Sequence, residues 1–144
     1  MNQNELMLRK LKIECCFEPC IVEEDDELYQ NGIFIFNITK MYEFIVSNTH
    51  IFCIESILIE NYRYQKSNLD EIHIQNTDIN RPGIIAEIAP GRYNLIDGNH
   101  RIEKASRLGN KKFDVYRFNM ESHLQFLTTK NGYFAYVDYW NSKL

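Results

Sequence analysis

The sequence lacks a basic surplus, a long apolar run and an amino-terminal targeting pattern. Its 144 residues carry 16 Lys and Arg against 20 Asp and Glu, which gives a formal net charge of −4. A protein that works on phosphate backbones usually carries excess basic residues, so no DNA partner is expected. No apolar stretch approaches the ~20 residues of a membrane span, and the first residues have no signal-peptide layout. We therefore expect a cytoplasmic protein with no membrane partner.

The cysteines also lack the spacing of a metal site or a disulfide framework. Cys15, Cys16 and Cys20 fall within one short stretch, Cys53 stands alone, and no C-x-x-C pair occurs. Zinc sites commonly take their four ligands from such pairs or from histidines. We expect reduced cysteines that serve as small apolar residues, with no metal site and no disulfides.

The sequence does contain strand and helix patterns that alternate along its whole length. Hydrophobic residues make up 44% and charged residues 25%, as in an ordinary globular protein. No repeat, linker or low-complexity segment divides the chain. The expected fold class is therefore α/β (α+β), a single compact domain over 1–144 with a mixed sheet and helices.

The first half predicts a hairpin, a helix and a buried strand. Alternation over 10–22 indicates a strand, the acidic run 23–27 a solvated turn, and 33–36 the returning strand. Asn37 is a suitable N-cap for the helix that follows. The apolar residues expected on one face of that helix are Ile38, Met41, Tyr42, Ile45 and Val46. Residues 51–59 predict a buried strand, and 61–80 are polar.

The second half is more clearly punctuated. Strands are expected at 84–88, 93–96 and 113–118, the first two joined by Pro90 and Gly91 as a hairpin. The helix after the second strand has Ile102, Ala105 and Leu108 on one stripe and Gly109 as its left-handed stop. Asn119 is expected to cap a short helix that ends near 131–132. The aromatic tail 133–140 fits either a strand or a helix.

Asp97-Gly98-Asn99-His100-Arg101 follows directly on a predicted strand and opens a predicted helix. Glycine allows a sharp turn and a close approach by a ligand. The first helical turn carries unpaired backbone N–H groups and the positive end of the helix dipole, a combination that suits anions. His100 and Arg101 add side-chain donors, and Arg101 can grip a phosphate with two bonds. Asp97 can hold magnesium, accept a proton or orient Arg101.

The stretch from Tyr93 to Ala105, with Leu108-Gly109 behind it, resembles the ParB/sulfiredoxin superfamily. Members share a strand, a Gly-x-x-Arg core and a helix with an alanine one turn on, and the resemblance covers about 81–118. In this superfamily the helix start binds nucleotide phosphates: CTP in ParB proteins, ATP in sulfiredoxins, and an adenine nucleotide in a related serine kinase. The resemblance implies that Gly98, His100 and Arg101 contact phosphate and that Asn99 offers its backbone amide.

The chain departs from two branches of that superfamily. Sulfiredoxins place a catalytic cysteine directly before the His-Arg pair, where this chain has Asn99, so sulfinic-acid reduction lacks its nucleophile. ParB proteins usually carry two strongly basic residues where this chain has His100-Arg101, and they continue into a helix-turn-helix domain. Too few residues remain after Tyr116 for such a domain. A stand-alone member is the closer match.

Two classes of function follow. In the first, the protein binds ATP or CTP, with or without Mg²⁺, or another phosphate-bearing small molecule. It then acts as a phosphotransferase or NTPase, with Asp97 or Glu87 as base or metal ligand. In the second, it is a non-catalytic module that binds a protein partner, as accessory or immunity-type proteins do. The bland alternatives also stay open: Asp97 as a helix cap, His100 and Arg101 as solvated residues, and Glu87 as a solvent-facing strand residue.

Overall fold

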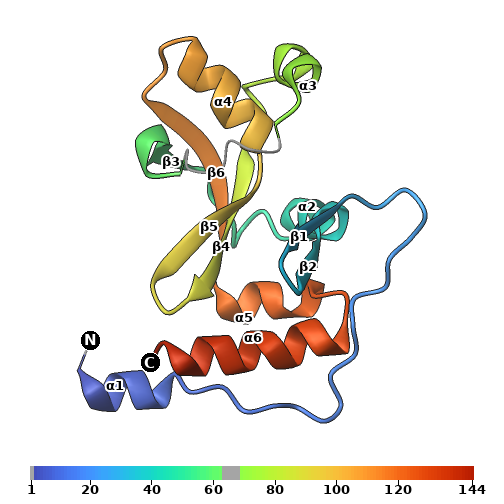
Figure 1. The fold of residues 1–144 in the computed structure, drawn as a ribbon, viewed down its shortest axis with the longest axis vertical. Helices are drawn as coiled ribbons and strands as arrows, with labels where there is room; N and C mark the ends of the chain where they lie inside the picture. Colours follow the sequence, from blue (N-terminus) through green and yellow to red (C-terminus); the bar gives the residue numbers. More distant parts are fainter. Residues whose placement is uncertain (1, 63–68) are drawn as a thin grey trace. The chain divides into compact units, whose positions relative to one another are not determined.

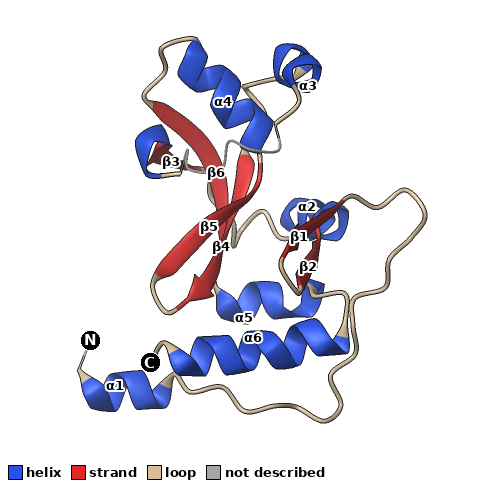
Figure 2. Ribbon diagram, in the orientation of Figure 1, coloured by secondary structure: helices blue, strands red, loops and turns tan. Residues whose placement is uncertain are grey.

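The computed structural model describes residues 2–62 and 69–144, and it has the expected mixture of helices with a mixed sheet (Figures 1 and 2). The elements in chain order are α1 (Gln3–Leu8), β1 (Leu28–Asn31), β2 (Phe34–Asn37), α2 (Ile38–Ser47), β3 (Glu55–Leu58), the 3-10 turn η1 (Ile59–Asn61), α3 (Glu71–Asn76), β4 (Gly83–Ala89), β5 (Arg92–Asp97), α4 (Asn99–Arg107), β6 (Lys112–Phe118), α5 (Met120–His123), the 3-10 turn η2 (Leu124–Phe126) and α6 (Lys130–Ser142). No helix in these two ranges is long and apolar enough to cross a membrane.

The strands form two sheets. β1 and β2 pair as an antiparallel hairpin. The other sheet has the order β3-β6-β4-β5, with β6 antiparallel to β3 and parallel to β4. The predicted hairpin of β4 and β5 is present, and its two-residue connection includes Gly91 with a φ of 72°.

The contacts of the chain cluster in two units. Unit 1 comprises Met1–Ser47, Glu87–Tyr93 and Asn119–Leu144, and unit 2 comprises Asn48–Ala86 and Asn94–Phe118. Each unit has its own apolar centre. The most deeply buried large side chains of unit 1 include Phe36, Met41, Leu127, Tyr136 and Trp140, and those of unit 2 include Ile84, Ile85, Ile96, Ile102 and Phe118.

The helix predicted after Asn37 is confirmed as α2. The Asn37 side chain accepts a hydrogen bond from the backbone N–H of Lys40 at 3.1 Å, so it caps the helix as expected. Ile38, Met41 and Ile45 are buried, whereas Val46 is 75% exposed and lies outside the buried stripe.

The strand predicted over 10–22 is wrong. This segment forms no strand, and the first strand of the hairpin is β1, which follows the acidic run. The physical reason is that side chains of α6 bind the backbone of the segment: Leu11 pairs with Asn141, and the N–H of Glu14 donates to the Tyr133 hydroxyl. Alternation alone does not reveal that a helix is the partner.

The end of the helix expected after Asn119 is also wrong. α5 spans four residues and η2 three, and Asn131 and Gly132 lie in the first turn of α6. Thr129 caps α6, because its hydroxyl oxygen accepts from the N–H of Gly132 at 2.9 Å. The aromatic tail is therefore helical.

Two further expectations about burial fail. The strand within 51–59 is only β3, an edge strand, and Ile51, Ile54 and Leu58 are exposed. The cysteines are free thiols, but Cys15, Cys16 and Cys53 are exposed rather than packed as small apolar residues.

The polar region 61–80 contains the unpredicted helix α3.

Candidate functional site

The turn between β5 and α4 has the predicted strand–glycine–helix geometry. β5 ends at Asp97, Gly98 follows in the left-handed region with a φ of 107°, and α4 begins at Asn99. The N–H of Ile102 donates to the carbonyl of Gly98 at 2.8 Å and starts the helical hydrogen bonds. The amides of the three residues before Ile102 therefore have no acceptor within the helix, and they form the positive end of its dipole.

Position 98 requires glycine because of the space around it as well as its positive φ. A Cβ at this position would lie 3.3 Å from the Cα of Gly83 and 3.3 Å from the ring of Phe113. Gly83 is the first residue of β4, and a Cβ there would meet the backbone oxygen of Asp97. Two glycines thus allow the start of β4 and the β5–α4 turn to approach closely, which only residues without side chains permit.

Arg101 holds this turn together from inside. Its Nη2 donates to Asp97 Oδ2 at 2.8 Å and to the carbonyl of Pro82 at 3.2 Å. The Arg101 and Asp97 side chains are 9% and 11% exposed. Of the three roles that the sequence allows for Asp97, the structure places it as the residue that orients Arg101. The alternative of Arg101 as a solvated first-turn residue is wrong, because its side chain is buried.

His100 contacts α3. The N–H of Asp70, which caps α3, donates to His100 Nε2 at 3.3 Å, and the His100 ring stacks on His73 with centroids 3.8 Å apart. Burial, and after it the neighbouring His73, lowers the pKa of His100. A neutral ring with Nε2 as acceptor fits both contacts. His100 and Asn99 are the half-exposed residues of the turn.

Two more side chains of α4, which the sequence did not single out, also contact α3. Lys104 Nζ donates to the carbonyls of Gln75 and Thr77, both at 2.8 Å. Arg107 makes two bonds to Glu71, at 2.7 and 2.8 Å. α3 is therefore held against α4 largely by polar contacts, apart from its buried Ile74.

Glu87 belongs to unit 1 and binds residues of that unit. Its Oε2 accepts from Arg9 at 3.1 Å and from the N–H of Gly91 at 2.8 Å, and its Oε1 accepts from the N–H of Met120 at 3.1 Å. The residue is 2% exposed, so the solvent-facing alternative is wrong. These contacts give Glu87 an architectural role, and none of them involves the turn at 97–101.

The backbone of Glu87 carries a second group of polar contacts that the sequence did not indicate. Its carbonyl accepts from the Tyr136 hydroxyl at 2.7 Å and lies 2.6 Å from His123 Nε2. Burial lowers the pKa of His123 to about 4 and raises the pKa of Tyr136. His123 is fully buried. Its separation of 36 residues from Glu87 leaves no local signal.

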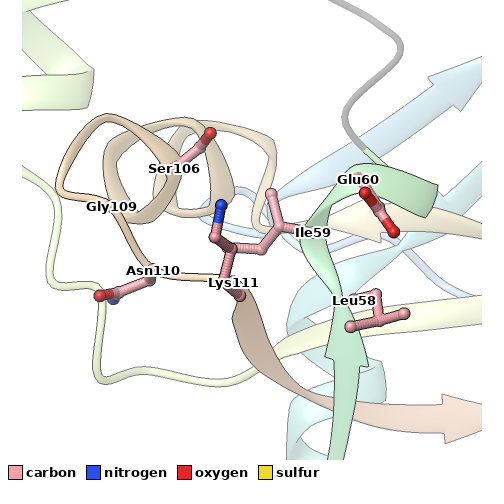
Figure 3. A pocket seen from close by; sticks show the side chains of 7 residues that line it. All are labelled: Leu58, Ile59, Glu60, Ser106, Gly109, Asn110 and Lys111. Atoms are coloured by element: carbon pink, nitrogen blue, oxygen red, sulfur yellow. The ribbon is translucent and has the colours of Figure 1, made fainter.

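A groove of about 380 Å³ lies at the opposite, carboxyl-terminal end of α4. It is bounded by η1 and the end of β3 on one side and by residues that follow α4 on the other (Figure 3). Figure 3 shows Glu60 and Asn110 pointing to opposite sides, while Ser106 and Lys111 lie close to Ile59. None of the predicted site residues lines this groove.

No protein-family model matches the chain, and no curated protein sequence is significantly similar to it. Within 2–62 and 69–144, no cluster of three or more His, Cys, Asp or Glu side chains is arranged to hold a metal ion.

Proposed function

We propose that the turn at residues 97–101 binds a phosphate group of a nucleotide, or of another phosphate-bearing small molecule. The observation that carries the proposal is the strand–glycine–helix turn, in which α4 starts directly after Gly98 with three backbone amides that have no acceptor within the helix. Backbone amides at a helix start and the helix dipole both favour an anion. The resemblance of this stretch to the ParB/sulfiredoxin superfamily supports a nucleotide, ATP or CTP, as the ligand.

Each residue of the turn has a distinct part in this proposal. Asn99, His100 and Arg101 offer backbone amides, and the Arg101 guanidinium supplies positive charge next to Gly98. Asp97 orients that guanidinium through the 2.8 Å bond and keeps it in place when no ligand is bound. The proposal assigns Asp97 this orienting role, and any Mg²⁺ would arrive with the nucleotide.

Thermal stability in the presence of nucleotides tests the proposal. ATP, CTP, GTP, UTP and pyrophosphate are added to the full chain with and without Mg²⁺, and unfolding is followed by fluorescence. A ligand present at 100 times its dissociation constant should stabilise the protein by about 2.7 kcal/mol. No shift with any of these phosphates at millimolar concentration would contradict the proposal.

A matched pair of substitutions then locates the site. Asn99→Asp places a carboxylate at the first residue of α4, where the helix dipole favours it, so folding should be preserved. The new charge repels a phosphate, and affinity should fall by roughly tenfold or more. Asn110→Asp makes the same chemical change beyond the other end of α4 and should leave affinity unchanged. Equal effects of the two substitutions would place the ligand elsewhere.

A further inference from the structure

The segment from Arg9 to Phe17 has no helix or strand, yet α6 binds it at regular intervals. Figure 1 shows this part of the chain between α1 and β1, on the side of α6. Most of its side chains, including those of Lys10, Lys12 and Ile13, are exposed. Its attachment therefore depends on a few contacts with four residues of unit 1, here called the docking face: Glu87, Tyr133, Trp140 and Asn141.

The first contact is specific for arginine. Arg9 forms an ion pair with Glu87 at 3.1 Å, and its guanidinium lies over the Trp140 ring, 4.8 Å from the centroid. Trp140 Nε1 also donates to the Arg9 carbonyl at 2.9 Å. Glu87 and Trp140 are both almost completely buried. A buried carboxylate beside an aromatic ring favours a planar, always-charged guanidinium over an ammonium.

The second contact is with the backbone of the segment. The Asn141 side chain accepts from the N–H of Leu11 and donates to its carbonyl, both at 2.8 Å. This two-way pairing copies what a neighbouring strand would provide, so it requires an extended backbone and no particular side chain. Further along, the N–H of Glu14 donates to the Tyr133 hydroxyl at 2.9 Å, and the Phe17 ring stacks on Tyr133 with centroids 4.0 Å apart.

We propose that the docking face is a recognition site for an extended protein segment that carries an arginine, and that residues 9–17 occupy it as a built-in competitor. The partner is a protein segment of the same chemistry: an arginine for Glu87 and Trp140, an extended backbone two residues later for Asn141, and an aromatic ring eight residues after the arginine for Tyr133. Charge complementarity at the buried carboxylate selects this partner. The proposal does not depend on phosphate binding by the turn at 97–101.

The built-in competitor lowers the affinity with which a free peptide can bind the docking face. A tethered segment acts at an effective concentration in the millimolar range, so a free peptide binds the unmodified chain weakly. Weakening the internal contact should therefore expose the site. This relation distinguishes a displaceable segment from a fixed part of the core.

The test uses the full chain and a fluorescent peptide of residues 8–18 with Cys15→Ser and Cys16→Ser. We expect the peptide to bind the Arg9→Ala chain at least ~tenfold more tightly than the wild type, as measured by anisotropy. Lys12→Ala, a change on the exposed side of the same segment, should behave as the wild type. A peptide that carries Arg9→Ala should not bind, and adding Asn141→Ala to the Arg9→Ala chain should weaken binding.

A second variant covers the case in which Arg9→Ala does not fold. Leu11→Pro removes the N–H that Asn141 binds but keeps the ion pair of Arg9 with Glu87. Absence of peptide binding by folded loosened chains would overturn the proposal, as would equal binding of the peptide without arginine. If the wild type forms a dimer and Arg9→Ala abolishes it, the occupant of the docking face is a second copy of this chain. That result would overturn the proposal of a separate protein partner.

Discussion

The two units each contain an arginine paired with a buried carboxylate, and the pairs differ in how the chain brings them together. In unit 2, Asp97 and Arg101 lie four residues apart and meet at 2.8 Å across one turn. In unit 1, Arg9 and Glu87 lie 78 residues apart and meet at 3.1 Å. The local pair shapes a turn, whereas the long-range pair connects the amino-terminal segment to the end of β4. Similar chemistry thus positions a candidate ligand site in one unit and fastens the chain in the other.

Removing the carboxylate of the long-range pair should have the largest effect. Glu87→Ala leaves the Arg9 guanidinium and the N–H groups of Gly91 and Met120 without their acceptor. The free energy of unfolding should fall by about 3–5 kcal/mol, as when a buried pair is broken from one side. Urea unfolding measures this change. A loss below ~1 kcal/mol would show that the pair does not fasten unit 1.

Removing the arginine of the local pair should have the next largest effect. Arg101→Ala leaves a buried Asp97, and the free energy of unfolding should fall by about 3 kcal/mol. This cost stays below that of Glu87→Ala, since the nearby start of α4 favours the Asp97 carboxylate. The burial of the Arg101 side chain is the reason that a loss is expected, because an exposed arginine would contribute little to stability.

The same substitution also tests the ligand site. Arg101→Ala should lower nucleotide affinity by roughly ten- to a hundredfold. Arg101→Lys should restore only part, because lysine keeps the positive charge but not the guanidinium that bonds to Asp97 and the Pro82 carbonyl. Arg107→Ala, on the same helix with a side chain that is 44% exposed, is the control and should keep nucleotide affinity. Lost stability with unchanged affinity would leave Arg101 as a purely structural residue.

Acid should act on unit 1 through His123. Its pKa is lowered by burial to about 4, whereas an unfolded histidine titrates near 6.5. Between these values the unfolded chain binds a proton that the folded chain does not, so stability falls as the pH falls from 6.5 toward 4. The loss at pH 5 should be about 2 kcal/mol relative to pH 7.5.

Substitutions of two histidines assign that loss. His123→Phe should remove it from the pH dependence of urea unfolding, and His50→Gln, at an exposed position, should retain it. The same slope in His123→Phe as in the wild type would assign the acid sensitivity to other groups.

The sequence predicted the features whose causes are local. Gly98 and Gly109 both have positive φ, and Gly109 ends α4 with the N–H of Asn110 bonded to the Ala105 carbonyl. The cap of α2 by Asn37 is also local, because a helix cap depends only on residues next to it in the sequence. Leu108 is expected on the same helix stripe as Ile102 and Ala105, but it is 62% exposed. Helical spacing therefore does not predict burial beyond the last turn of α4.

The features that the sequence could not predict depend on distant residues. Residues 10–22 alternate like a strand, but their backbone partner is the side chain of Asn141, 130 residues from Leu11. His123 and Glu87 carry no local sign of burial, since their contacts include residues far away in the sequence, such as Arg9 for Glu87 and Phe36 for His123. α6 begins at Lys130 and includes in its first turn an Asn131-Gly132 pair that ordinarily marks a turn, and the Thr129 cap outweighs that tendency.

A third arginine–carboxylate pair gives the smallest expected effect and the sharpest test of what distinguishes the other two. Arg117 Nε and Glu55 Oε2 are 2.7 Å apart, closer than either buried pair, but their side chains are 42% and 41% exposed. Water screens this attraction, so a double-mutant cycle with Arg117→Ala and Glu55→Ala should give a coupling of only about 0.2–1 kcal/mol. High salt should reduce it further. A coupling of about 3 kcal/mol, the size of the loss expected for Arg101→Ala, would mean that distance rather than burial decides these energies. The small value expected here instead assigns the larger losses to the buried groups that are left unpaired when one partner of the other pairs is removed.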